Sequence, residues 1–171
     1  PDLSDQNPEL PFLLGFNSYG KLNYLSGLIR TVKCPNDNSK AKLLLGTPGN
    51  GDILFIDGNA SSSVALLGDN LAVLALENLW GGIVVNGCVR DVEVLKNLPI
   101  CIFALGACPK RSKKNNKGEV GTTIEVQGVK IDQGFWVYAD QNGILISTKK
   151  LFSRYEDCLL YTSDAADDGS R

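Results

Sequence analysis

The chain has 171 residues, 43% of them hydrophobic, which is enough for one compact domain with its own core and too few for two ordinary domains. Its formal net charge of −2 excludes both the basic field of a general nucleic-acid binder and the acidic composition of a disordered chain. No apolar run approaches the roughly 20 residues that span a bilayer, and the N-terminal region lacks a secretory signal pattern, so we expect a soluble, cytoplasmic protein.

The cysteine and histidine content restricts the chemistry that the chain can perform. The five cysteines form no Cys-x-x-Cys pair, so we predict reduced, packed thiols and neither a zinc knuckle nor a disulfide framework. Histidine is absent, which excludes Ser-His-Asp and Cys-His catalysis and His-ligated zinc. A catalytic site in this chain must therefore use carboxylates, Arg, Lys, hydroxyls, backbone groups or a metal.

Both ends of the sequence differ from those of an intact translated protein. The chain contains no Met and begins with Pro1, so we expect a truncated N-terminus. Its last residues include Cys-Leu-Leu-Tyr-Thr-Ser-Asp-Ala-Ala-Asp-Asp, which matches one reading frame of a transposase sequencing adapter. We therefore interpret residues 158–171 as a cloning or assembly artefact and assign the domain to residues 1–157.

The first third of the chain alternates turn-rich and apolar segments. A mixed segment at residues 3–14 is compatible with a short helix, and a turn-rich connector follows at 15–20. Alternating apolar and polar residues predict a half-buried strand over 27–34. A helix is expected over 40–45, and a short apolar run bounded by carboxylates predicts a buried strand over 52–57.

The middle third predicts helices that alternate with buried strands. Residues 58–63 form a loop of small residues that lacks a Walker-type Lys, so we interpret it as a turn and not as a phosphate cradle. Apolar residues recur at helical spacing over 66–79, and Asp69 or the preceding serines can cap this helix. The remaining predicted elements are a strand at 83–85, two helical turns within 91–98 and a strand at 100–105. This order is typical of parallel crossover units in an α/β sheet.

The last third changes in character. Residues 109–117 are basic through Lys110, Arg111, Lys113, Lys114 and Lys117, but aromatic residues are absent from this run, so we interpret it as a solvated loop and not as a nucleic-acid platform. Short strands are expected over 124–131, 135–139 and 144–147, with turn residues between them. An antiparallel β portion therefore follows the α/β part.

Asp69, Arg90 and Asp91 form the most informative constellation in the sequence. They fall at a predicted helix start and directly after a predicted strand, at the edge where open α/β sheets bind ligands. Backbone N–H groups of residues 68–71 would favour an anion at the helix N-terminus, and Arg90 could hold a carboxylate in bidentate geometry. Asp91 is a hard oxygen ligand suited to Mg²⁺ or Mn²⁺. Taken by themselves, these residues also fit a helix cap and a surface ion pair.

Three longer motifs resemble one family, the RraA-like family, which contains 4-hydroxy-4-methyl-2-oxoglutarate aldolases with oxaloacetate decarboxylase activity and the regulator of ribonuclease activity A. These motifs are Gly68-Asp69-Asn70-Leu71, the run from Gly82 to Asp91, and Trp136-Val137-Tyr138-Ala139-Asp140, and the similarity extends from about residue 2 to about residue 147. The resemblance implies a swivelling β/β/α-type single domain, with a central sheet, flanking helices and a C-terminal antiparallel β portion. It also implies a homotrimer with active sites near subunit boundaries.

The resemblance assigns roles to individual residues. The family's substrate loop falls on Gly68, Asp69, Asn70 and Leu71, its substrate-binding arginine on Arg90, and its divalent-metal ligand on Asp91. Asp69 matches the first acid of the aldolase pattern. Regulatory members tend to lack the Asp after the Arg, so Asp91 favours the enzymatic branch. In some aldolases the neighbouring subunit supplies a further carboxylate.

The implied function is cleavage of a C–C bond in a 2-oxo acid to give pyruvate, with the metal as a Lewis acid that stabilises the enolate. A metal-bound water hydrogen-bonded to Asp69 is the expected base for the aldol reaction. A Schiff-base route is disfavoured because residues 68–91 contain no Lys, and a methyltransferase is disfavoured because no Gly-x-Gly-x-x-Gly turn follows a strand. The alternative from another class is a non-catalytic protein that binds and inhibits a ribonuclease.

Overall fold

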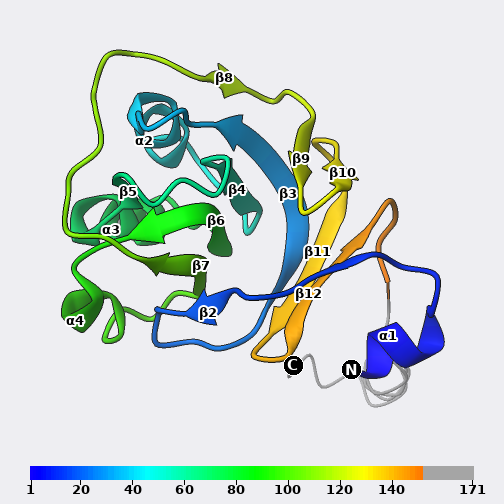
Figure 1. Cartoon of the computed structure of the whole chain (residues 1–171). Coiled ribbons are helices and arrows are strands. Elements are labelled where there is room, and N and C mark those ends of the chain that lie inside the picture. Colours follow the sequence, from blue (N-terminus) through cyan, green and yellow to red (C-terminus); the bar gives the residue numbers. More distant parts are fainter. Residues whose placement is uncertain (152–171) are drawn as a thin grey trace.

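The computed structural model describes residues 1–151, and a ten-stranded mixed sheet is its main element. The long strand β3 (Leu25–Lys33) joins two parts of this sheet (Figure 1). On one side it pairs in parallel with β4, and the parallel order continues through β4 (Ile53–Asp57), β6 (Gly82–Val89) and β7 (Ile102–Ala107). The predicted adapter-derived segment, residues 158–171, lies outside the described residues.

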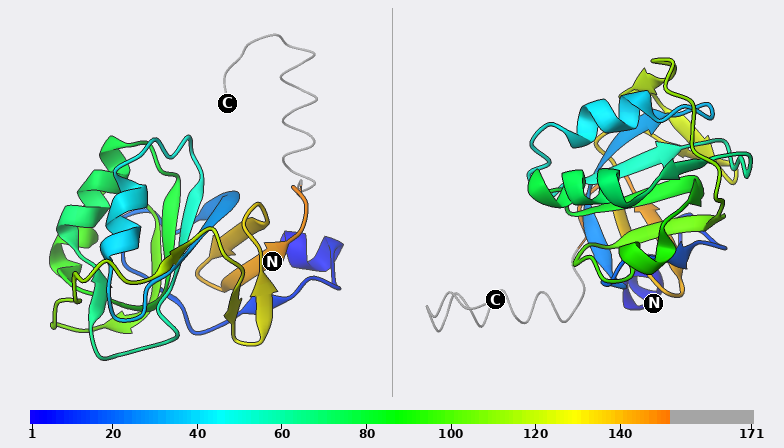
Figure 2. Two further views of the ribbon diagram at one scale, coloured as in Figure 1. Left: turned by 90° about the horizontal axis from the view of Figure 1, so that it is seen from above. Right: turned by 90° about the vertical axis from the view of Figure 1, so that its left-hand side faces the viewer.

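Three helices cover one face of the parallel part, as Figures 1 and 2 show. They are α2 (Ser39–Leu45), α3 (Asp69–Glu77) and the short α4 (Val92–Leu95). Small apolar residues on their inner sides, such as Ala41, Ala72 and Ala75, are fully buried, which allows close packing against the sheet. Burial of this apolar face stabilises helices that are too short to persist alone.

The antiparallel part forms a second β layer on the opposite side of β3 (Figure 2). Its strands are β11 (Trp136–Asp140), β12 (Gly143–Ser147) and β1 (Phe12–Leu13), and a separate hairpin consists of β9 (Ile124–Val126) and β10 (Val129–Ile131). A second apolar core that includes Phe55, Phe103 and Val137 lies between the layers. The remaining elements are peripheral: α1 (Asp2–Gln6), β2 (Asn17–Ser18), β5 (Ala65–Leu67) and β8 (Glu119–Val120). The predicted fold class, α/β with flanking helices and a C-terminal antiparallel portion, is confirmed.

Several predicted elements have the wrong extent. The strand predicted over 83–85 is part of β6, which continues to Val89, and the helix compatible with 3–14 is limited to the short α1. The helix predicted over 66–79 begins only at Asp69, because residues 65–67 form β5 and pair in parallel with the end of β6. Strand β4 ends opposite Asn86 while β6 continues to Val89, so β5 occupies the edge that β4 leaves open. The strand predicted over 124–131 is a hairpin, in which Gln127 and Gly128 have positive φ angles of 51° and 79°.

Within residues 1–151, no helix has the length and apolar character needed to cross a bilayer.

A buried carboxylate, Asp37, fixes the loop that follows β7 to the start of α2. Asp37 is 1% exposed, and its side chain accepts hydrogen bonds from the backbone of Ser39 and Asn115. Burial alone would raise the pKa of the Asp37 carboxyl, but hydrogen bonds from Ser39 and from the backbone of Asn115 and Lys117 outweigh it and lower the pKa below its ordinary value. The ionised carboxylate therefore contributes to the stability of the fold.

We expect Asp37→Asn to destabilise the protein at pH 7 by about 2 kcal/mol, because hydrogen bonds to a charged group are lost. Since the folded pKa is depressed, the contribution of Asp37 is fully present above its unfolded pKa of about 3.9 and disappears as the pH falls through the lower folded pKa. Urea denaturation between pH 7 and pH 2 measures both effects. Asp5→Asn, at an exposed carboxylate, serves as the control. Equal unfolding free energies for wild type and Asp37→Asn across this range would contradict the prediction.

Candidate functional site

The candidate site lies where β5 ends, α3 begins and β6 leaves the sheet. Every residue of β6 is buried up to Val89, so Arg90 is the first residue of this segment to reach partial exposure. The Arg90 N–H donates to Leu67 O at 2.9 Å, which extends the β5–β6 pairing by one step. This pairing places Arg90 and Asp91 beside the Gly68–Asp69 step at the N-terminus of α3.

Asp91 has a backbone conformation that suits its residue type. Its φ and ψ angles of 59° and 41° lie in the left-handed region, which Asp and Asn tolerate better than most other residues. Asp91 precedes α4, and its carbonyl accepts the Val94 and Leu95 N–H groups. Its side chain does not cap α4 and turns to α3, where Oδ2 accepts the Asp69 N–H at 3.1 Å.

Gly68 lies within contact distance of the Asp91 and Arg90 side chains. A Cβ atom added to Gly68 would lie 2.7 Å from Asp91 Oδ2, 3.4 Å from Arg90 Cγ and 3.6 Å from Arg90 Nε. Any side chain at position 68 would therefore displace the Asp91 carboxylate or the Arg90 side chain. The family resemblance implies that Gly68 lies in a substrate loop, and these close contacts explain why this position has no side chain.

The start of α3 provides hydrogen-bond donors, and two of them are already used. The Asp69 N–H bonds Asp91, and the Asn70 N–H bonds Asp69 Oδ1 at 2.7 Å. The Leu71 N–H has no hydrogen-bond partner within residues 1–151, while the Leu71 side chain is buried in the core between helices and sheet. Leu71 can therefore contribute only its backbone to a ligand at the helix N-terminus.

Arg90 is a half-buried cation without a carboxylate partner among residues 1–151. The expectation from spacing alone, a surface ion pair between Arg90 and Asp91, is therefore not met, because their charged groups lie more than 4.0 Å apart. A guanidinium left unpaired beside a helix N-terminus is suited to an anionic ligand, to which it can donate two parallel hydrogen bonds.

The predicted residues are therefore brought together at one edge of the sheet. Gly68, Asp69, Arg90 and Asp91 are all partly exposed, so the site is open to solvent. Cys88 lies nearby but is 6% exposed, and burial, together with the neighbouring Cys108, raises the pKa of its thiol. A protonated, buried thiol fits the predicted packing role and not that of a nucleophile.

Metal-ligating side chains are sparse. Among residues 1–151, no group of three or more His, Cys, Asp or Glu side chains could hold a metal ion. The described chain therefore offers no complete protein cage. Asp91 presents one carboxylate, of which Oδ2 holds the Asp69 N–H and Oδ1 makes no bond to a described residue. A single hard oxygen ligand fits Mg²⁺, which keeps several waters and often takes only one or two protein carboxylates.

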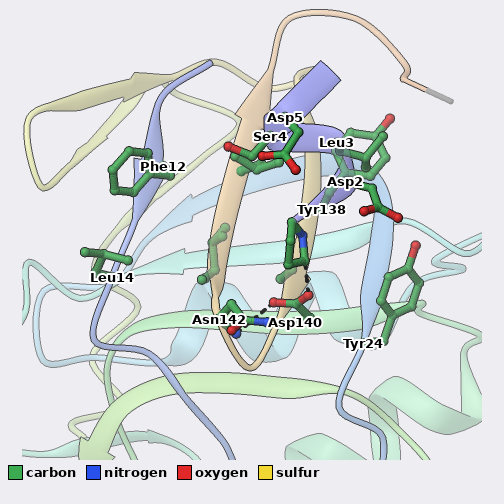
Figure 3. Close-up of a pocket in the computed structure, with 15 residues that line it drawn as sticks. Asp2, Leu3, Ser4, Asp5, Phe12, Leu14, Tyr24, Tyr138, Asp140 and Asn142 are labelled. Carbon is green, nitrogen blue, oxygen red and sulfur yellow. Dashed lines mark hydrogen bonds and ion pairs between the residues drawn. The ribbon is translucent and has the colours of Figure 1, made fainter. Parts of the chain in front are cut away.

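A cavity lies at a different end of the molecule. It has a volume of about 630 Å³ and is lined by α1, β1, β11, β12 and Tyr24. Figure 3 shows Phe12, Leu14 and Tyr24 around this cavity together with Asp2, Asp5 and Asp140. None of the predicted site residues lines it, so this cavity is separate from the Arg90–Asp91 site.

Structural neighbours match most of the chain. A solved structure described as the RNA-processing inhibitor RraA from Thermus thermophilus superposes with a TM-score of 0.85 at 41% identity, covering 88% of this chain and 93% of that one. A second, described as an S-adenosylmethionine: 2-dimethylmenaquinone methyltransferase from Geobacillus kaustophilus, has a TM-score of 0.85 and 41% identity, and covers 88% of this chain and 94% of that one.

Sequence comparisons agree with the structural ones. A 4-hydroxy-4-methyl-2-oxoglutarate aldolase from Thermus thermophilus is 44% identical over 148 residues, which are 85% of this chain and 89% of that protein. The family model for RraA-like proteins, described as Aldolase/RraA, matches residues 1–146. The matched range includes every residue of the site described above. The chain therefore belongs to the RraA-like family.

Proposed function

We propose that the protein is a divalent-metal-dependent lyase that cleaves a C–C bond of 2-oxo acids to give pyruvate, acting as a 4-hydroxy-4-methyl-2-oxoglutarate aldolase with oxaloacetate decarboxylase activity. The observation that carries this proposal is the Arg90 guanidinium, which has no ion-pair partner in the described part of the chain and lies beside the Asp91 carboxylate at the N-terminus of α3. The aldolase named among the relatives supports the same reaction class.

Each side chain has a separate task in the proposed mechanism. Arg90 binds and orients the substrate carboxylate, and the free Leu71 N–H donates a further hydrogen bond to it. Asp91 would hold Mg²⁺ or Mn²⁺, which supplies the Lewis acid that stabilises negative charge on the substrate during cleavage. The absence of a side chain at Gly68 lets Asp91 and Arg90 approach the start of α3 closely.

Asp69 is the proposed proton acceptor for the aldol reaction. Its Oδ1 atom accepts the Asn70 N–H, so one oxygen is fixed, while Oδ2 makes no hydrogen bond to a described residue. We propose that Oδ2 takes the proton of the substrate 4-hydroxyl, directly or through one water. Decarboxylation of oxaloacetate needs no such base, so loss of Asp69 should affect the aldol reaction more strongly.

The direct test uses purified protein with oxaloacetate and with 4-hydroxy-4-methyl-2-oxoglutarate, and measures pyruvate with Mg²⁺ and with EDTA. The proposal requires pyruvate release from both substrates that depends on the added metal. Absence of pyruvate release at any metal concentration would refute it.

Arg90→Lys tests the role of the guanidinium fork. We expect kcat/KM for oxaloacetate to fall about 30-fold, since a point charge retains attraction but cannot form two parallel hydrogen bonds. Arg90→Gln, which also removes the charge, should have a lower kcat/KM for oxaloacetate than Arg90→Lys. Steady-state kinetics of the three proteins provide the comparison, and wild-type activity in Arg90→Lys would contradict a bidentate role.

Two features away from the site support two further parts of the proposal. Phe12, Leu14 and Tyr24 are between 54% and 58% exposed, and we propose that such apolar surface is covered in a homotrimer. The described cysteines, Cys34, Cys88, Cys101 and Cys108, are free thiols, which fits the reducing cytoplasm, where we propose that the protein acts.

The second candidate function is binding and inhibition of a ribonuclease without catalysis. It is favoured by the structural neighbour described as an RNA-processing inhibitor. Inhibition of a ribonuclease by a protein that releases no pyruvate from either oxo acid would support this function over the lyase.

A further inference from the structure

The segment that follows β7 passes directly beside the candidate site. The Cys108 N–H donates to Val89 O at 2.9 Å, and Lys110 O accepts the Ala65 N–H at 2.8 Å. Within three residues the chain therefore crosses from the β7 side of β6 to the outer side of β5. It then continues past α2 towards β8, along the edge of the molecule where β6 and β7 end (Figure 1).

This segment, residues 110–117, carries a concentrated positive charge. Five of the chain's 17 basic residues lie in it and no acidic one, although the chain as a whole has a net charge of −2. All five side chains are exposed, and within residues 1–151 none of them forms an ion pair. The five residues are Lys110, Arg111, Lys113, Lys114 and Lys117. We call residues 110–117 the basic segment.

The backbone of the basic segment is held in place next to the site. Lys113 bonds Asn36 and Asn38 through its backbone N–H and carbonyl, and the buried Asp37 carboxylate accepts the Asn115 N–H. Lys114 Nζ lies 3.5 Å from Asn38 Oδ1, and Asn38 Nδ2 donates to Leu66 O at 3.1 Å. The Asn38 side chain therefore links the Lys114 ammonium to β5, the strand that precedes Gly68.

We propose that the basic segment is an electrostatic guide that concentrates doubly charged oxo acids at the Arg90–Asp91 site. This inference rests on the function proposed above and adds how its dicarboxylate substrates reach the site. Unpaired charges act over a Debye length of about 8 Å at physiological salt, and charge-lined entrances raise substrate association by about 10-fold to 10³-fold. A field acts on total ligand charge, so the free energy gained by a dianion is twice that gained by a monoanion.

The test compares two triple variants of equal net charge. Lys110→Gln/Lys113→Gln/Lys117→Gln removes three charges from the basic segment, and none of these side chains has a partner within the described residues. Lys21→Gln/Lys130→Gln/Lys149→Gln removes three exposed charges elsewhere and is the matched control. Calorimetry measures binding of oxalate, a dianion, and pyruvate, a monoanion, to the Mg²⁺-loaded proteins at low and high salt.

We expect the basic-segment variant to weaken oxalate binding about 10-fold and pyruvate binding about 3-fold at low salt, and both less than about 2-fold in high salt. The control variant should bind both ligands within about 2-fold of wild type, since its lost charges are remote. The guide would be overturned if the basic-segment variant weakened the binding of both ligands equally. It would also be overturned if the control variant weakened oxalate binding as much as the basic-segment variant does.

The outcomes also separate this inference from the proposed function. A wild-type protein that binds neither anion would refute the lyase and the guide together. Wild-type binding that the basic-segment variant leaves unchanged at low salt would refute the guide alone. If the basic-segment variant loses binding of a single-stranded RNA oligonucleotide but keeps the wild-type affinity for oxalate, the basic segment binds nucleic acid instead.

Discussion

Asp91→Asn should reduce Mg²⁺-dependent pyruvate release by about 10³-fold, equivalent to roughly 4 kcal/mol of transition-state stabilisation. The amide keeps an oxygen that can accept the Asp69 N–H, but it loses the negative charge that would hold the cation. Asparagine is the informative replacement because it tolerates the left-handed backbone at position 91, where φ is 59°. Asp91→Ala would remove the charge and strain the backbone together.

The measurement is pyruvate release as a function of Mg²⁺ concentration, accompanied by thermal unfolding. Asp91→Asn should unfold at nearly the wild-type temperature, because the backbone and the hydrogen bond to α3 are retained. Glu125→Gln, which neutralises an exposed carboxylate on β9, controls for the change in net charge. Turnover in Asp91→Asn within about threefold of wild type would remove Asp91 from the metal site.

Gly68→Ala should lower kcat/KM by about 100-fold although it adds only one methyl group, because a small displacement of catalytic groups is costly. The added Cβ would lie 2.7 Å from Asp91 Oδ2, which is closer than carbon and oxygen can approach, and 3.4 Å from Arg90 Cγ. The Asp91 carboxylate must therefore move and lose its hydrogen bond to the Asp69 N–H. The backbone φ of −135° at Gly68 is accessible to alanine, so the effect is steric and local.

Gly46→Ala is the matched control for this substitution. A Cβ at Gly46 would meet backbone oxygens of α2 only at 3.5 and 3.6 Å, and its φ of −77° also suits alanine. This variant should keep wild-type kinetics. Steady-state kinetics and a crystal structure of Gly68→Ala would test the explanation, and an unmoved Asp91 side chain with full activity would contradict it.

Periodicity in the sequence predicted most elements, and its failures have physical reasons. The strands β3 and β4 and the helix α2 were predicted within two residues of their ends. The sequence predicts residues 66 and 67 as helical because Leu67 continues the helical spacing of α3, but pairing of β5 with the exposed end of β6 determines their conformation. Gln127-Gly128 is a turn signal that lay within a run interpreted as one strand.

The sequence predicted that the candidate residues lie together, but it did not predict the geometry of their contacts. The positions of Asp69, Arg90 and Asp91 in the chain indicated that they share one edge of the sheet, and the structure places them there. The steric role of Gly68 and the clamp formed by Asp37 depend on contacts between segments more than 20 residues apart. Single-sequence patterns do not report such contacts.

Arg90 lacks a carboxylate partner within residues 1–151, which has a consequence for the protein without its ligand. A guanidinium that is partly withdrawn from water and lacks a counterion disfavours the folded chain relative to the unfolded one. If an anion binds Arg90 as proposed, it supplies that counterion, so ligand occupancy and conformational stability are thermodynamically linked at this position. In the proposed site, some robustness of the empty protein is thus exchanged for recognition.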